Sequence, residues 1–88
     1  MRLTWSANAW EDYLYFQAYE PKLVERINEL IKDAKRSPFA GLGKPEPLKG
    51  DLKTYWSRRI TGNHRLVYRL TGTGQEQALE IVQCRFHY

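Results

Sequence analysis

The chain has 88 residues, which is enough for one compact core and too few for two, so we expect a single domain over residues 1–88. Hydrophobic residues make up 42% and charged residues 27% of the sequence, which excludes a disordered chain. The formal net charge is +4, and the excess of Lys and Arg lies in residues 44–69, as expected either for a phosphate-binding surface or for a solvated basic face.

Membrane insertion and metal binding find no support in the sequence. No apolar run approaches the roughly 20 residues that span a bilayer, and residues 1–5 lack the apolar region of a signal peptide. We therefore expect a cytoplasmic protein. Cys84, the single cysteine, is expected in the core, and one Cys with two His is too few for a zinc site, so we expect no metal or other cofactor.

The first half of the chain is expected to form a short strand and two helices. Apolar and polar residues alternate weakly over residues 2–5, which indicates a short strand. Ser6 is a good N-cap for a first helix. Pro21 suits the first turn of a second helix. Its apolar stripe consists of Leu23, Val24, Ile27, Leu30, Ile31 and Ala34. Its polar side is expected to carry Lys22, Glu25, Arg26, Glu29, Lys32 and Asp33.

The second half is expected to form a loop and an antiparallel meander. Residues 37–48 contain three of the four prolines, which predicts an ordered loop or lid without regular structure. Three later segments are rich in aromatic and β-branched residues and are separated by glycine-containing turns, which predicts strands over residues 54–60, 65–70 and 77–85. Two helices on such a sheet make an α+β fold.

The middle predicted strand has two different faces because side chains alternate along a strand. One face carries Leu66, Tyr68 and Leu70, and the helices should cover it. The other face carries Arg65, Val67 and Arg69, and is left for solvent or a ligand. Residues 84–88 continue the last predicted strand, so the chain end is expected to be held in the sheet.

Phosphodiester cleavage without a metal requires a base, a cation and an acid, and five residues are candidates for these roles. The base removes the 2′-hydroxyl proton, the cation stabilises the phosphorane, and the acid protonates the leaving 5′-oxygen. The candidates are Glu46, Arg59, Arg65, His87 and Tyr88. Spacing alone does not assemble them into a site.

Each candidate also has an alternative interpretation. Glu46 can be a solvated loop carboxylate and His87 a mobile chain end. The two arginines can simply cover apolar surface with their stems. Tyr88 can be a core or dimer-interface aromatic residue. His64 lies in a predicted hairpin turn, where polar residues are ordinary, and we assign it no role in the mechanism.

Four segments resemble the Txe/YoeB family of the RelE/ParE toxin superfamily. They are Lys44-Pro45-Glu46-Pro47-Leu48-Lys49, Trp56-Ser57-Arg58-Arg59-Ile60, His64-Arg65-Leu66-Val67-Tyr68 and Cys84-Arg85-Phe86-His87-Tyr88. The combination of these four segments in this order is specific to the family, whereas any one segment alone would be weak evidence for it. Similarity at Trp5-Ser6 and in residues 27–33 extends the resemblance over essentially the whole chain.

The resemblance implies a microbial-ribonuclease-like fold and a type II toxin that cuts mRNA in the A site of the 70S ribosome. It implies a YefM-like antitoxin and a homodimer as partners. By matching position, Glu46 is the general base, Arg65 the transition-state cation and His87 the general acid, while Tyr88 orients substrate or His87. The residues expected to bind RNA are Lys49, Lys53, Arg58 and Arg59.

Two other functions remain open at this point. A ParE-like topoisomerase poison shares the fold and needs no nuclease residues, and the presence of Glu46 with His87 and Tyr88 argues against it. A non-catalytic RNA-binding module needs only the basic strands, and Glu46 would then repel phosphate. Codon preference, activity on free RNA, the antitoxin and the oligomeric state are not determined by these patterns.

Overall fold

A computed structural model describes residues 1–52 and 54–87, so Lys53 and Tyr88 lie outside the described residues. Strand β1 (Arg2–Trp5) leads into helices α1 (Ala7–Tyr19) and α2 (Pro21–Arg36). The rest of the chain forms β2 (Glu46–Pro47), the 3-10 turn η1 (Gly50–Leu52), β3 (Trp56–Arg59), β4 (Arg65–Thr71), the 3-10 turn η2 (Gly74–Glu76) and β5 (Ala78–Gln83). No helix within the described ranges is long and apolar enough to cross a membrane.

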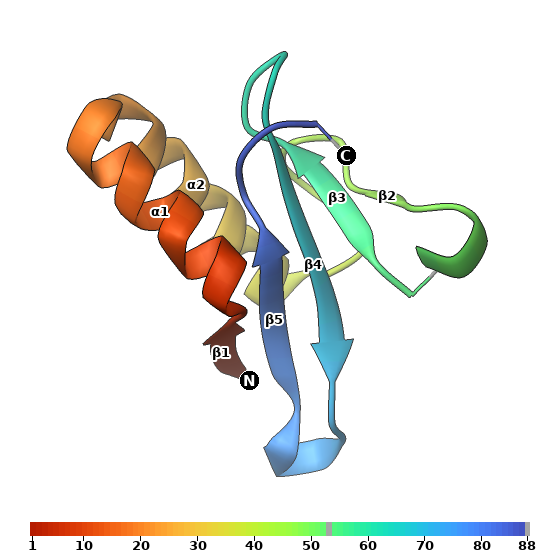
Figure 1. The fold of residues 1–88 in the computed structure, drawn as a ribbon. Helices are drawn as coiled ribbons and strands as arrows, with labels where there is room; N and C mark the ends of the chain where they lie inside the picture. The colour runs from red at the N-terminus through yellow and green to blue at the C-terminus, as the bar shows by residue number, and fades with distance from the viewer. Residues whose placement is uncertain (53, 88) are drawn as a thin grey trace.

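The strands form one five-stranded sheet in the order β1-β5-β4-β3-β2, with the two helices side by side against it (Figure 1). Strands β3, β4 and β5 form the predicted antiparallel meander. The sheet is mixed, however, because β1 pairs with β5 in parallel. The α+β fold with an N-terminal strand and two helices on a meander is confirmed.

Local sequence explains where the helices begin. Ser6 is the N-cap of α1, and its Oγ accepts a hydrogen bond from the N–H of Ala9 at 3.0 Å. The same hydroxyl donates to the carbonyl of Val82 at 3.1 Å, which ties the start of α1 to β5. Pro21 occupies the first turn of α2, where its missing N–H costs nothing.

The core lies between the helices and one face of the sheet. Helix α2 contributes Ile27, Leu30, Ile31 and Ala34, and the meander contributes Leu66, Tyr68, Leu79 and Ile81. The predicted stripe of α2 and the predicted core face of β4 are therefore confirmed. Cys84 is also buried in this core, as expected, and burial raises the pKa of its thiol to about 12.

Three local predictions were wrong. Asp33, expected on the polar side of α2, is buried. The loop over residues 37–48 includes a short strand, because Glu46 and Pro47 pair with β3 at the sheet edge, where a proline is tolerated. The last strand ends at Gln83, and the chain then turns through Phe86, whose φ is 65°, so residues 84–87 do not continue the strand.

Candidate active site

The face of the sheet that turns away from the helices carries several of the predicted site residues. Glu46 pairs with Ser57 across β2 and β3, and Arg59 pairs with Arg65 across β3 and β4. Directly paired residues, and residues two apart on one strand, share a face. Glu46 therefore lies one row from the pair of arginines, on the same face.

The two arginines differ in exposure. Arg59 is exposed, whereas only 8% of Arg65 is accessible. Arg65 Nη1 donates to the carbonyls of Thr61, Gly62 and His64 at 2.7, 3.3 and 3.1 Å, which anchors the guanidinium in the β3–β4 turn. Within the described residues its Nε and Nη2 make no hydrogen bond.

The segment after β5 is held at several points. The Asp12 carboxylate accepts from the N–H of Cys84 at 3.2 Å, and burial raises the pKa of Asp12. The guanidinium of Arg85 stacks over the ring of Tyr15 at 3.5 Å. The N–H of Arg65 donates to the carbonyl of Phe86 at 3.1 Å. The residue that follows, His87, is therefore carried to the start of β4, although not by a strand.

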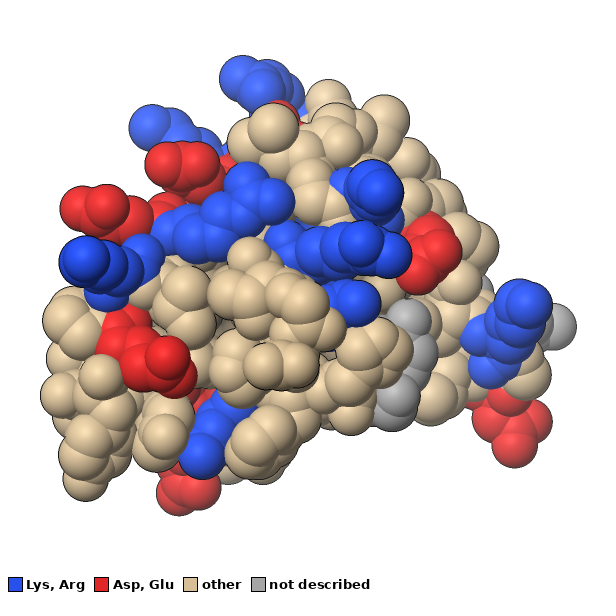
Figure 2. All heavy atoms as spheres, turned by 90° about the horizontal axis from the view of Figure 1, so that it is seen from above, with Lys and Arg blue, Asp and Glu red and all other residues tan. Residues whose placement is uncertain are grey.

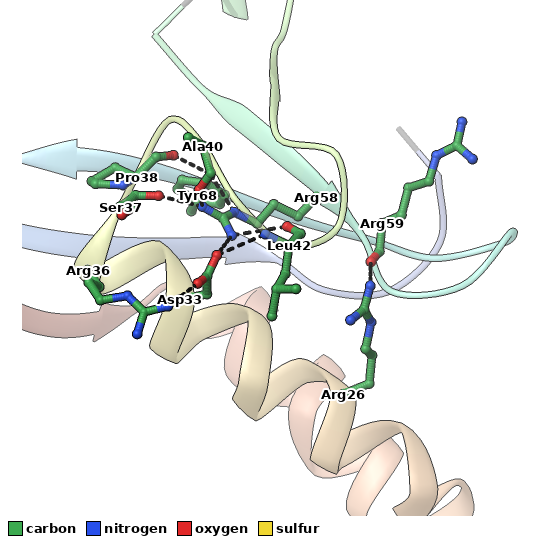
Figure 3. Close-up of polar contacts among 10 residues, drawn as sticks. All are labelled: Arg26, Asp33, Arg36, Ser37, Pro38, Ala40, Leu42, Arg58, Arg59 and Tyr68. Carbon is green, nitrogen blue, oxygen red and sulfur yellow. Dashed lines mark hydrogen bonds and ion pairs between the residues drawn. The ribbon is translucent and has the colours of Figure 1, made fainter.

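The loop that leads to Glu46 is organised by one buried cation (Figure 3). Arg58 is 0% exposed, and all five of its N–H donors are used. The acceptors are the Tyr68 hydroxyl at 3.0 Å, Asp33 Oδ2 at 2.6 Å, and the carbonyls of Leu42 at 3.0 Å, Ser37 at 2.6 Å and Ala40 at 2.9 Å. The prediction that Arg58 contacts RNA is therefore wrong, because no donor or surface of it is left for a phosphate.

Asp33 is the buried carboxylate that forms an ion pair with Arg58. Its carboxylate also accepts from the N–H of Leu42 at 2.9 Å and from Arg36 at 2.7 Å. The bond from Leu42, followed by the one from Arg58, lowers the pKa of Asp33 to about 2. The carboxylate stays ionised and fixes the loop at the end of α2.

Two glycines allow the loop to pack this closely. A Cβ on Gly41 would lie 2.2 Å from Asp33 Oδ2, and one on Gly43 would lie 2.8 Å from the side chain of Leu30. Both glycines also have positive φ, of 114° and 79°, which L side chains rarely adopt. The carbonyl of Gly43 then accepts from the N–H of Arg59 at 2.7 Å, and this bond connects the loop to the arginine pair.

The structure does not place Glu46 and His87 in one cavity. Glu46 lines a hollow of about 440 Å³ together with Lys49 and Leu52. His87 lines a larger hollow, of about 680 Å³, between α1 and the C-terminal segment. The structure thus brings together the two arginines and the segment that carries His87, with Glu46 at one side of them. Tyr88 and Lys53 lie outside the described residues.

Basic side chains concentrate at this end of the molecule. Figure 2 looks onto the end where the β3–β4 connection and the C-terminal segment lie, and Lys and Arg side chains cluster near its centre with an acidic side chain directly beside them. Lys49 and Arg59 are both exposed. In residues 1–52 and 54–87, no three His, Cys, Asp or Glu side chains lie close enough to share a metal ion.

Sequence reasoning missed two residues that shape this region. Asp33 lies three residues after Leu30, a spacing that suits the buried stripe, and this was a signal that it faces inward. His64 accepts a hydrogen bond from the N–H of Phe86 through Nδ1 at 2.8 Å. No local pattern indicates this contact, because the two residues are 22 positions apart.

Comparison with known proteins identifies the family. Residues 5–88 match the model of the YoeB-like toxins of bacterial type II toxin-antitoxin systems. The toxin YoeB of Escherichia coli strain K12 is 54% identical over 88 residues, which cover 100% of both chains.

Solved structures of relatives agree with this assignment. The structure of a YoeB/ParE toxin from Agrobacterium tumefaciens is 60% identical, with a TM-score of 0.95 and 100% of both chains covered. Staphylococcus aureus YoeB has been solved as a dimer, at 45% identity, and in a heterotetrameric complex with YefM, at 44% identity. Both have a TM-score of 0.86 and cover 100% of this chain and 98% of theirs. The chain therefore belongs to the YoeB-like toxins of bacterial type II toxin-antitoxin systems.

Proposed function

We propose that this toxin is an endoribonuclease that cuts mRNA in the A site of the 70S ribosome without a metal and so inhibits translation. One arrangement carries the proposal. An exposed carboxylate, Glu46, shares a sheet face with the opposed cations Arg59 and Arg65, and the segment leading into His87 is bonded to Arg65. A carboxylate beside paired cations suits acid-base cleavage of a phosphodiester better than simple phosphate binding.

In the proposed reaction the 2′-oxygen attacks phosphorus as Glu46 accepts the hydroxyl proton. Arg65 stabilises the charge on the non-bridging oxygens through the donors that the turn does not use. The bond from phosphorus to the 5′-oxygen breaks, and His87 donates a proton to that oxygen. The products are a 2′,3′-cyclic phosphate and a 5′-hydroxyl. By the family resemblance, Tyr88 orients His87 or the substrate.

The docking surface follows from the exposed cations. Lys49 lines the same hollow as Glu46, and Arg59 is exposed beside Arg65. We assign RNA binding to Lys49, Arg59 and, by resemblance, Lys53. The solved dimer and YefM complex of the Staphylococcus aureus relative support a homodimer and a YefM-like antitoxin as partners of this chain. Ribosomal action places the toxin in the cytoplasm.

The test is cleavage of ribosome-bound mRNA by the purified toxin. Glu46→Gln removes the base without changing size and should lower the single-turnover rate by a factor of about 10² to 10⁴. Glu29→Gln, an exposed carboxylate on α2, is the matched control and should leave the rate unchanged. A 2′-deoxy nucleotide before the scissile bond should block cleavage, because the nucleophile is then missing. Intact mRNA together with inhibited gyrase supercoiling would favour the topoisomerase function.

A further inference from the structure

Two consecutive residues, the last residue before β4 and the first residue of β4, bind the backbone of a single residue near the chain end. His64 Nδ1 accepts from the N–H of Phe86 at 2.8 Å. The N–H of Arg65 donates to the carbonyl of Phe86 at 3.1 Å. Both polar backbone groups of Phe86 are therefore held by His64 and Arg65, and the next residue is His87.

Phe86 needs this support because of its backbone conformation. Its φ is 65°, in the left-handed region where a Cβ crowds the following carbonyl. A non-glycine residue stays in that region only where its surroundings over-determine it. Because Phe86 is itself exposed, burial of its ring in the core does not supply that constraint. The hydrogen bonds from His64 and Arg65 hold the Phe86 backbone directly, and the ring of Phe86 adds contacts with the His64 ring at 5.9 Å and with the Arg85 guanidinium at 4.4 Å.

His64 is well placed to act as a rigid acceptor. Its ring packs edge-on against the buried Phe16, with centroids 5.1 Å apart and planes at 80°. Its carbonyl accepts from the N–H of Ile60 at 3.0 Å and from Arg65 Nη1 at 3.1 Å. A backbone N–H can only donate, so Nδ1 is the acceptor in the bond to Phe86.

We propose that His64 is a positioning residue for His87, an inference that rests on the proposed function. The imidazole does not touch the substrate. It holds Phe86 in the left-handed turn and thereby sets the direction in which the chain continues from Phe86 to His87. In wild-type toxin the general acid is thus placed by the histidine that immediately precedes the transition-state cation in sequence.

Three substitutions separate the acceptor of His64 from its packing. His64→Asn puts a carboxamide oxygen near the position of Nδ1 and can retain the bond. His64→Gln carries its polar atoms one bond further out, and His64→Phe keeps the ring against Phe16 without an acceptor. Asn63→Ala, an exposed neighbour in the same turn, is the control.

Two readouts are needed, namely amide hydrogen exchange at Phe86 and single-turnover cleavage of ribosome-bound mRNA. His64→Phe and His64→Gln should lose protection of the Phe86 amide and cleave at least about tenfold more slowly, since misplacement by about 1 Å can cost on the order of 10²-fold. His64→Asn should keep protection and most of the rate, and Asn63→Ala should match wild type. If His64→Phe unfolds, the difference in Phe86 protection and cleavage rate between His64→Asn and His64→Gln tests the positioning role.

The same variants in a His87→Ala background separate this inference from the proposed function. If His64 acts through His87, His64→Phe should cost no further rate once His87 is gone. If His87→Ala alone cleaves at the wild-type rate, the general acid is misassigned, while exchange at Phe86 still reports whether His64 holds the turn. A protected Phe86 amide in His64→Phe, or an undiminished additional loss in the His87→Ala background, would overturn the positioning role.

Discussion

Arg59 lies directly opposite Arg65 where β3 pairs with β4. Like charges in opposed positions destabilise an antiparallel sheet. Within residues 1–52 and 54–87, neither arginine forms an ion pair. The sheet therefore pairs two cations across neighbouring strands, and their repulsion should lower its stability unless an anionic ligand lies beside them.

Removing one charge of this pair should stabilise the free protein and weaken its binding. Arg59→Gln should raise the free energy of unfolding by up to about 1 kcal/mol. The same variant should bind ribosomes less tightly and with a flatter dependence on salt. Urea denaturation and binding at several salt concentrations measure these effects. Lys32→Gln, an exposed cation on α2, controls for net charge. A destabilised Arg59→Gln would show that the arginines support the sheet rather than a ligand.

The buried network around Arg58 should dominate local stability. Arg58→Ala strands the buried Asp33 and frees three loop carbonyls, and loss of one partner of a buried ion pair typically costs about 3 to 5 kcal/mol. Denaturant unfolding measures this loss. Arg36→Ala, which removes the exposed partner of Asp33, should cost less than about 1 kcal/mol. Equal losses in the two variants would contradict the role given to the buried arginine.

Stability should also fall in acid because of Asp33. Its pKa in the folded protein is about 2, below the ordinary value of 3.8, so the ionised carboxylate favours the folded state. This contribution is complete above the ordinary value and disappears as the pH falls through the range between 3.8 and about 2. Urea unfolding at several pH values should therefore show a steeper loss in wild type than in Asp33→Asn. Parallel curves would contradict this assignment.

Arg65 should tolerate no replacement by lysine. Its Nη1 is committed to three turn carbonyls, and only the rest of the fork is left for the phosphorane. A lysine has one point of charge and cannot serve both sets of acceptors. Arg65→Lys should lose most of the cleavage rate, with a smaller change in ribosome binding. Thermal unfolding is the control, since the turn loses an anchor as well. Wild-type cleavage would show that net charge suffices.

The regular elements were predictable because their signals are local. Ser6 and Pro21 mark helix starts, and the spacing of Ile27 and Leu30 marks a buried face. The parallel pairing of β1 with β5 was not predictable from the sequence, because it joins segments from opposite ends of the chain. The end of β5 was placed too late, since Phe86 is a strand-forming residue type and the turn is imposed by tertiary contacts.

The candidate site was predictable in composition and less so in geometry. Adjacent arginines in sequence have opposite fates, because alternation along β3 sends Arg58 into the core and Arg59 to the other face. Charge alone does not distinguish them. The partner that accommodates Arg58, Asp33, comes from another element, and so does the His64 that binds Phe86. Such contacts depend on how the elements pack together, and no pattern of residue spacing in the sequence indicates them.

The division of labour between Glu46 and His87 is tested most directly with mRNA that carries sulfur in place of the 5′-bridging oxygen at the cleavage site. A thiolate leaves without protonation, so a general acid is dispensable for this substrate. On natural mRNA, His87→Ala and Glu46→Gln should each lower the single-turnover rate by a factor of about 10² to 10⁴. On the sulfur substrate, His87→Ala should recover to near the wild-type rate, and Glu46→Gln should remain slow. An equal defect of His87→Ala on both substrates would contradict its role as the general acid.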